Sequence, residues 1–258
     1  LKKQDFDIFH PTYFDDYFLE YLGRKPFVLT IHDMIPELFP EMQIDSYIID
    51  KKAKLASKAA HIIAVSENTK KDIINILGIE EKKISVIYHG SSVEKQKSDI
   101  ANILPEKYIL YVGSRENYKN FYFFLSSLKS LLYKDNDLNI VCTGADFTET
   151  ELNFIKDLSL LDRIIHHYIT DKQLFEVFRL AKAFVFPSYY EGFGIPIIEA
   201  FNCECPVILS RSSCFPEIAG EAALYFNPKN KVELISAVES ILENDNIRSS
   251  LISKGLQR

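Results

Sequence analysis

The segment from Gly113 to Asn120 (GSRENYKN) places two cations directly after an apolar run, Tyr108–Gly113, that predicts a buried strand. In open α/β sheets, ligands bind where strands end and the following helices begin. Arg115 and Lys119 at such a position suit a diphosphate, because guanidinium and ammonium groups donate charge-assisted hydrogen bonds to phosphate oxygens. The alternative is two surface cations at a helix start, but positive charge there opposes the helix dipole. We therefore predict a diphosphate site here.

A second loop, PSYYEGFGIPIIEA at residues 187–200, combines two glycines with two carboxylates after another predicted strand. Gly192 and Gly194 let the backbone approach a ligand closely, and the N–H groups that open the next helix can bind an anion. Glu191 lies in the loop and Glu199 about one turn into the helix, so both can face one crevice. Carboxylates beside a phosphate suit the hydroxyls of a sugar and a ribose, which donate hydrogen bonds to them. Taken alone, Glu199 is better explained by the helix dipole, which favours carboxylates in a first turn.

The elements that position these loops alternate along the chain. Short apolar runs are separated by amphipathic stretches, and most of the runs are continuous, as in strands covered on both faces of a parallel sheet. The predicted strands are Phe6–His10, Phe27–His32, His61–Ser66, Ile84–His89, Tyr108–Gly113, Asn139–Gly144, Ile164–Ile169, Ala183–Pro187, Pro206–Ser210 and Ala223–Phe226. The predicted helices are Ser46–Ala59, Glu67–Leu77, Asn120–Tyr133, Glu149–Leu158, Lys172–Ala181, Pro196–Cys203 and Lys231–Glu243. This alternation predicts an open α/β fold, or two of them in series.

One polar segment divides the chain. Ser91–Asn102 (SSVEKQKSDIAN) is charged, lacks a strong period and precedes a new strand, so it is typical of a linker between domains. We predict a first domain over residues 1–95 and a second over residues 96–258.

Composition and charge exclude several classes of protein. Hydrophobic residues make up 47% and charged residues 26% of 258 residues, which indicates a globular chain rather than a disordered or fibrous one. Thirty Lys and Arg residues against 36 Asp and Glu residues give a net charge of −6, so we predict no nucleic-acid partner. The pairs Lys51-Lys52, Lys70-Lys71 and Lys82-Lys83 are interpreted as solvated surface, and a peripheral contact with an anionic membrane face stays open.

The cysteines point to no metal site. Cys203-Glu204-Cys205 is too tight for the usual C-x₂-C zinc pair, and no second pair follows it. We therefore expect reduced thiols and a cytoplasmic location, at the inner face of the membrane if membrane contact occurs. No apolar run approaches the ~18 residues of a membrane helix, and the first residues carry no secretory leader.

These motifs together resemble a known family. The run from Ala183 to Pro228 is similar to the donor-site signature of the family 4 retaining glycosyltransferases, through Glu191-x₇-Glu199, the Gly-Phe-Gly loop and Ser212–Glu217 in that order. The segment 111–120 resembles the family's diphosphate-binding motif, and residues 61–69 and 83–90 resemble the last units of its N-terminal domain. One departure is Glu204, where the family usually has glycine, which affects the local turn. The resemblance implies a GT-B fold, an α/β architecture of two Rossmann-like domains with parallel sheets facing across a cleft.

The resemblance also implies roles for individual residues. Arg115 and Lys119 would bind the donor diphosphate, with Gly113 at the start of their loop. Glu191 would contact the hydroxyls of the donor sugar, and Glu199 those of the ribose. Two further kinds of donor contact are implied. The side chain of Ile169 would lie against the base, and the sugar and phosphate would contact the backbone amides of Gly192, Phe193, Gly194 and Ile195.

His32 is the candidate from the first half of the chain. It ends the apolar run Phe27–His32, and a lone histidine there is more simply a strand-end or capping residue. In the family, a histidine at this place faces the donor sugar, which favours a catalytic role. The sequence HDMIPELFPE at residues 32–41 is also similar to bacterial mannosyltransferases that build cell-surface polysaccharide, which implies GDP-mannose as the donor.

The chemistry that the resemblance implies is sugar transfer with retention of anomeric configuration. An acceptor hydroxyl, on a saccharide or lipid-linked saccharide, attacks the donor sugar while the nucleoside diphosphate leaves on the same face. Preorganised positive charge at such a developing anion contributes about 3–4 kcal/mol per strong donor. We predict no cofactor beyond the nucleotide sugar and no metal, because no Asp-x-Asp follows a strand and two cations already face the diphosphate.

Other functions leave different signatures. A nicotinamide dehydrogenase requires G-x-G-x-x-G, but Ile197 stands where the third glycine would follow Gly192-Phe193-Gly194. A P-loop motif is absent. A GT-B nucleotide-sugar epimerase and a non-catalytic nucleotide-sugar binding module both stay open, because a fold alone proves no activity. The length of 258 residues leads us to expect a two-domain enzyme cut at both ends, with the first strands of the acceptor domain and the final crossing helix missing.

Overall fold

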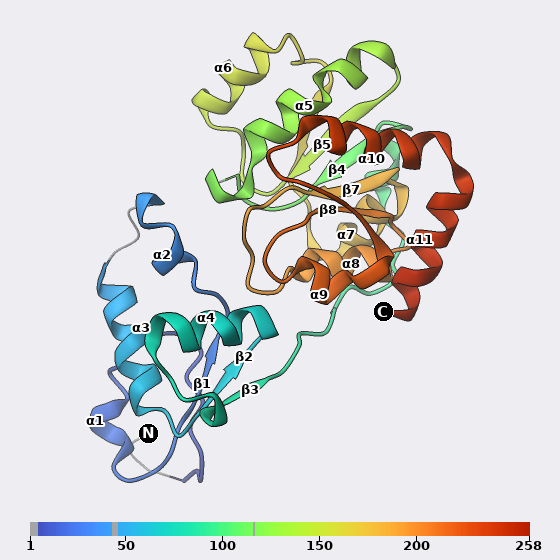
Figure 1. The fold of residues 1–258 in the computed structure, drawn as a ribbon. Coiled ribbons are helices and arrows are strands. Elements are labelled where there is room, and N and C mark those ends of the chain that lie inside the picture. Colours follow the sequence, from blue (N-terminus) through green and yellow to red (C-terminus); the bar gives the residue numbers. More distant parts are fainter. Residues whose placement is uncertain (1–4, 43–45, 116) are drawn as a thin grey trace. The chain divides into compact units, whose positions relative to one another are not determined.

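A computed structural model describes residues 5–42, 46–115 and 117–258. The chain forms two compact units (Figure 1). The first is made of residues up to His89 together with Glu191–Phe193, and the second of Gly90–Tyr190 and Gly194–Arg258. The division after His89 lies just before the predicted linker.

The first unit holds a small parallel sheet in the order β1-β2-β3. Its strands are β1 (Val28–Ile31), β2 (His61–Ala64) and β3 (Ile84–Val86), and its helices are α1 (Leu19–Leu22), α2 (Ile35–Leu38), α3 (Ser46–Lys58) and α4 (Glu67–Leu77), with 3₁₀ turns η1 (Pro40–Met42) and η2 (Glu81–Lys83). Helix α4 begins after Ser66, whose hydroxyl accepts a hydrogen bond from the backbone N–H of Thr69 at 3.0 Å. Ser66 is therefore the N-cap of α4, and it satisfies one of the N–H groups that the first turn leaves without a helical partner.

The predicted strand over Phe6–His10 is wrong. Phe9 makes a single parallel bridge to Phe27, by accepting a hydrogen bond from the N–H of Val28 and donating one to the carbonyl of Pro26. The next bonds of a parallel ladder would need the N–H groups of Pro26 on one side and Pro11 on the other, and proline has none. Pairing therefore stops after one bridge.

The second unit is built on a six-stranded parallel sheet in the order β6-β5-β4-β7-β8-β9. Its strands are β4 (Tyr108–Tyr111), β5 (Asn139–Thr143), β6 (Ile164–His167), β7 (Ala183–Phe186), β8 (Val207–Ser210) and β9 (Ala223–Phe226). Every residue of β4, β7 and β8 is buried, which confirms the prediction drawn from their continuous apolar runs. In chain order within this unit, the arrangement is 3-2-1-4-5-6, the order of dinucleotide-binding sheets.

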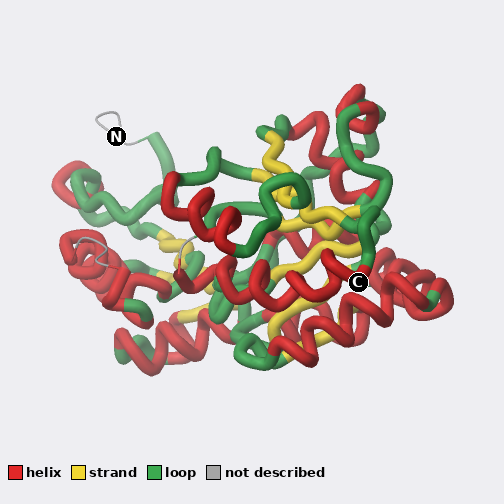
Figure 2. The backbone as a smooth tube through the Cα atoms, turned by 90° about the horizontal axis from the view of Figure 1, so that it is seen from above, coloured by secondary structure: helices red, strands yellow, loops and turns green. Residues whose placement is uncertain are grey.

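Helices cover both faces of this sheet, as the red and yellow segments of Figure 2 also show. The helices of the second unit are α5 (Phe121–Lys134), α6 (Glu149–Asp157), α7 (Asp171–Leu180), α8 (Ile195–Asn202), α9 (Phe215–Ala219), α10 (Lys231–Glu243) and α11 (Asp245–Gln257), with 3₁₀ turns η3 (Asp99–Asn102), η4 (Asn117–Lys119) and η5 (Gly220–Ala222). Helices α5 and α10 pack together on one face, and α7 and α8 on the other (Figure 1). Helix α11 was not predicted; it begins after Asn244, whose side chain accepts hydrogen bonds from two backbone N–H groups.

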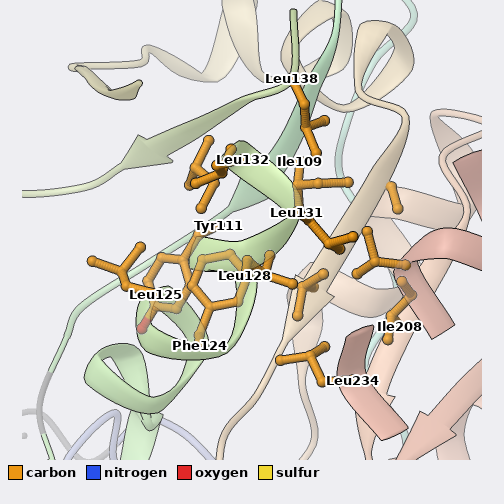
Figure 3. Close-up of a cluster of buried hydrophobic side chains, with 14 of the residues drawn as sticks. Ile109, Tyr111, Phe124, Leu125, Leu128, Leu131, Leu132, Leu138, Ile208 and Leu234 are labelled. Atoms are coloured by element: carbon orange, nitrogen blue, oxygen red, sulfur yellow. The ribbon is translucent and has the colours of Figure 1, made fainter. Parts of the chain in front are cut away.

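The main core of the second unit lies between the sheet and the α5–α10 face. The buried apolar residues of helix α5 are at positions 121, 124, 125, 128, 131 and 132, the spacing of one helical face. Figure 3 shows Phe124, Leu125 and Leu128 of this helix beside Ile109 and Tyr111 of β4. Because β4 is packed against α5 in this way, the start of the loop that follows β4 has a fixed position.

Among the described residues, no helix is long and apolar enough to cross a lipid bilayer.

Candidate functional site

The order of the larger sheet reverses between β4 and β7, and ligands of such sheets bind outside the carboxyl ends of the strands at that point. The two loops singled out from the sequence leave β4 and β7 there. They are joined directly, because the backbone N–H of Tyr189 donates to the carbonyl of Tyr118 at 2.7 Å. The structure therefore brings the predicted diphosphate loop and the start of the glycine loop together at the reversal.

Two glycines shape the neighbouring strand ends. Gly113 follows β4 with φ of 110°, and Gly144 follows β5 with φ of 105°, both in the region that favours glycine. A Cβ added at Gly144 would lie 2.8 Å from the carbonyl oxygen of Gly113, whereas one added at Gly113 would meet nothing within 4 Å. Gly144 was not proposed from the sequence, although it follows an apolar run in the same way as Gly113.

Lys119 ends the 3₁₀ turn η4, in the loop after β4. Its ammonium nitrogen lies 4.9 Å from the ring centre of Tyr118 and 5.4 Å from that of Phe186, the last residue of β7. The charge is thus located at the reversal, between the two strand ends, where the sequence predicted a diphosphate-binding cation.

Arg115 is placed differently from Lys119. Its side chain is only 4% exposed, and its Nε donates to Oε1 of Glu151 at 2.8 Å. Its Nη2 donates to the carbonyls of Ala145 and Asp146, each at 2.7 Å. The remaining group, Nη1, is buried and has no hydrogen-bond partner among the described residues. The predicted contact of Arg115 with a diphosphate stays a prediction, and it has only Nη1 left to make it.

The start of helix α8 supplies backbone donors. Gly194 caps this helix with φ of 91°, and an added Cβ would lie 2.9 Å from Cδ1 of Ile197 and 3.2 Å from Cε1 of Phe215. Only glycine fits this position without strain. Helix α8 begins at Ile195, which is 41% exposed, and the first turn of a helix has N–H groups without helical partners.

Glu199 lies one turn further along α8 and is half-buried. Burial raises the pKa of its carboxyl, and the negative charge of Asp171, at the start of α7, raises it further. Ile169 lies two residues before Asp171, in the loop after β6, and is partly buried. The structure therefore brings the residues predicted for ribose and base to neighbouring helix starts.

Glu191, Gly192 and Phe193 group with the first unit and are all buried; Glu191 is 9% exposed. Their predicted contacts with a donor sugar stay predictions.

His32 directly follows β1 and stacks on a second histidine. The ring centres of His32 and His89 are 5.5 Å apart, and the ring planes differ by 9°. Burial lowers the pKa of His89, and the nearby His32 lowers it further. His89 was not proposed from the sequence; the available signal was its position at the end of an apolar run, as for His32.

Lys52 is buried, so the interpretation of the lysine pairs as solvated surface is wrong for this residue. Its side chain is 2% exposed, and Nζ lies 3.0 Å from Oε2 of Glu37, itself 5% exposed. The ammonium also donates to the carbonyl of Asp33 at 3.2 Å. Helix α3 turns this position inward, and the buried charge is compensated by a carboxylate from α2. Lys52 thus holds the loop that follows His32.

Each of the two units matches a known protein family. Residues 92–258 match the family model of the glycosyl transferases group 1, and residues 1–95 match that of glycosyltransferase family 4. The chain belongs to the glycosyl transferases group 1. The family resemblance noted in the sequence is confirmed.

Relatives of this group 1 chain include two O-antigen chain mannosyltransferases. The chain is 33% identical over 217 residues to the O-antigen chain mannosyltransferase RfbU of Salmonella typhimurium, covering 83% of this chain and 60% of that protein. It is 28% identical over 248 residues to the O-antigen chain mannosyltransferase B of Escherichia coli, covering 89% of this chain and 64% of that protein. The chain thus spans less than two thirds of the length of these relatives.

Solved structures establish the fold of this group 1 chain. Sucrose-phosphate synthase from Thermosynechococcus elongatus superposes with a TM-score of 0.80 at 20% identity, over 97% of this chain and 68% of that one. HepE of Anabaena, in complex with UDP and glucose, gives 0.81 at 17% identity, over 98% and 72%. These likenesses confirm the predicted GT-B fold.

Proposed function

We propose that the protein transfers a sugar from a nucleoside-diphosphate sugar to a saccharide or lipid-linked saccharide, with GDP-mannose as the donor and retention at the anomeric carbon. Membership of the glycosyl transferases group 1 supports sugar transfer. Relatives named as O-antigen mannosyltransferases support mannose and a surface-polysaccharide acceptor.

The observation that best supports a donor site is the hydrogen bond from the backbone N–H of Tyr189 to the carbonyl of Tyr118. It fixes the loop of Lys119 against the loop that leads to α8, at the reversal of the sheet. An ammonium group and the N–H groups of a helix start can then bind the same anionic ligand. A diphosphate is the part of a nucleotide sugar that needs such an arrangement.

In the proposed reaction, the acceptor hydroxyl forms a bond to the anomeric carbon as the bond from that carbon to the diphosphate breaks. The acceptor proton passes to the departing phosphate oxygen, so the attack and the departure share one face. Lys119 and the backbone amides of Gly194 and Ile195 stabilise the negative charge that grows on the diphosphate. Metal independence stays a prediction, tested by activity with and without a chelator.

The nucleoside end of the donor is assigned to residues near the starts of α7 and α8. Glu199 accepts hydrogen bonds from the ribose hydroxyls, which its half-buried position favours because water competes less there. Ile169 supplies an apolar contact to the base. His32 and Glu191 are assigned to the donor sugar.

The predicted cytoplasmic location and membrane contact stay predictions.

A panel of nucleotide sugars with thermal unfolding as the readout tests this function. A ligand that binds the native state raises the unfolding temperature, so GDP-mannose is expected to raise it more than UDP-glucose or UDP-N-acetylglucosamine. The Glu199→Ala variant should lose most of the increase. If no nucleotide sugar raises the unfolding temperature, the proposal is wrong; if GDP-mannose binds but is never cleaved or transferred with any acceptor, the protein is a binding module.

A further inference from the structure

We propose that Glu151 is a positioning residue for the diphosphate site, and that it acts by holding Arg115 between the loops that follow β4 and β5. This inference rests on the proposed function and changes the part played by one of its residues. Arg115 then shapes the loop that carries Lys119, and only its Nη1 group is left to face a ligand.

The hydrogen bonds of Arg115 support this role. A guanidinium group has five N–H donors, one on Nε and two on each terminal nitrogen. Nε is used by Glu151, and the two hydrogens of Nη2 are matched by the carbonyls of Ala145 and Asp146. All three partners lie on the loop after β5 or on the helix α6 that follows it. The guanidinium therefore ties the β4 loop to the β5 loop.

Two aromatic rings lie next to the guanidinium. The central carbon of Arg115 lies 4.8 Å from the ring centre of Phe147 and 5.7 Å from that of Phe121. Phe147 belongs to the β5 loop and Phe121 to the start of α5. A planar guanidinium can lie against such rings and still donate several hydrogen bonds in its own plane, which an ammonium group cannot do. The surroundings of Arg115 thus favour arginine over lysine.

Glu151 is held as firmly as Arg115. Its Oε2 accepts from the backbone N–H of Thr148 at 2.7 Å and from the hydroxyl of Thr148 at 3.0 Å, while Oε1 accepts from Arg115. Burial raises the pKa of this carboxyl, but the hydrogen bonds from Arg115 and Thr148 outweigh it and hold the pKa below its usual range. Glu151 therefore stays ionised and maintains its ion pair with Arg115.

Stability alone does not account for such a pair. The side chains of Arg115 and Glu151 are 4% and 7% exposed, and apolar residues in place of a buried ion pair are often equally stable or more so. A buried pair does fix geometry, because removal of either partner leaves a charge without compensation. Here the fixed geometry is that of Arg115 in the loop after β4, and its Nη1 group has no hydrogen-bond partner within the described part of the chain.

Titration calorimetry on the full chain tests the proposal, with GDP and GMP as probes and with UDP and UMP in parallel. The ratio of the GMP Kd to the GDP Kd reports on the second phosphate, because the two probes share base, ribose and first phosphate. We expect Glu151→Gln to lower this ratio roughly tenfold, as loss of a supporting partner does for metal ligands, with little change in the Kd of GMP. Glu149→Gln, an exposed residue in the same helical turn, is the matched control.

Arg115→Lys separates positioning from direct binding, and it serves also if Glu151→Gln does not fold. Lysine keeps the positive charge but cannot repeat the three directed hydrogen bonds. If Arg115 positions the loop, Arg115→Lys lowers the ratio as much as Glu151→Gln does.

Two results overturn the inference while the proposed function stands. In the first, a folded Glu151→Gln variant leaves the ratio unchanged, whether or not Arg115→Lys lowers it. In the second, Glu151→Gln weakens GMP and GDP equally, as a purely structural defect would. If the wild-type chain binds neither GDP nor UDP, the proposed function is wrong, and the inference falls with it.

Discussion

The imidazole rings of His32 and His89 lie parallel, with their centres 5.5 Å apart. The two residues follow β1 and β3, the strands that flank β2, so they meet at the carboxyl edge of the small sheet. Two imidazolium ions at this separation would repel each other. The neighbouring ring and burial together favour the neutral form of His89.

The His89 site predicts a dependence of stability on pH. Because the pKa of His89 is lowered in the folded state, the unfolded chain binds more protons just below the usual histidine pKa of 6.5. The free energy of unfolding should therefore fall as the pH drops from about 7 to about 5. In His89→Gln this fall should be smaller. Urea unfolding at both pH values measures it, and equal losses in the two proteins would contradict the assignment.

The buried pair of Lys52 and Glu37 predicts a large effect of a single substitution. Lys52→Ala leaves the carboxylate of Glu37 buried without its partner and should cost about 3–5 kcal/mol of unfolding free energy. Lys52→Met combined with Glu37→Leu removes both charges and should cost much less. Urea unfolding of the three proteins checks this. A double variant no more stable than the single one would show that the pair is not the cause.

Gly113 and Gly144 form a matched test of close backbone approach. Their φ angles are 110° and 105°, so alanine at either position pays a similar conformational cost of about 1–2 kcal/mol. Only at Gly144 does the new Cβ meet a backbone atom, at 2.8 Å. Gly144→Ala should therefore lower the unfolding midpoint clearly more than Gly113→Ala. Equal midpoints for the two variants would mean that the loops after β4 and β5 are further apart than described.

The backbone conformation of Glu204 leads us to expect that one substitution there stabilises the folded chain. It adopts φ of 57°, in the left-handed region that favours glycine, at the position where the sequence already departed from its family. Its ion pair with Lys95 spans 3.4 Å between side chains that are 49% and 67% exposed, so it contributes little. Glu204→Gly should raise stability by about 0.5–1 kcal/mol, measured by thermal unfolding. A lower unfolding temperature would show that the ion pair matters more than the strain.

Local pattern was enough to predict most of the fold. Helices α4 and α10 have the predicted bounds, Glu67–Leu77 and Lys231–Glu243, because their apolar faces repeat with helical spacing and their starts carry capping residues. The fully buried strands followed from continuous apolar runs. The strand over Phe6–His10 failed because Pro11, just after it, and Pro26, in its partner segment, have no N–H for the next ladder bonds; the effect of Pro26 is revealed only by the pairing.

The site was less accessible to sequence reasoning. Lys119 could be placed at a strand end, because position after an apolar run and charge are both local. The partners of Arg115 lie 30 to 36 residues further along the chain, so nothing near Arg115 indicates that its donors are engaged. The burial of Lys52 likewise depends on Glu37, which belongs to another helix. Long-range pairing of charges therefore decides what the local pattern leaves open.

The measurement that tests the central claim most directly is the affinity of the full chain for GDP, by titration calorimetry, in the wild type and in Lys119→Ala. Lys129→Ala, on helix α5, is the control for loss of a positive charge elsewhere in the same unit. We predict that Lys119→Ala raises the Kd at least roughly tenfold, the loss expected for a charge-assisted hydrogen bond, and that Lys129→Ala leaves it unchanged. Equal affinities in all three proteins would contradict a diphosphate site at the reversal of the sheet.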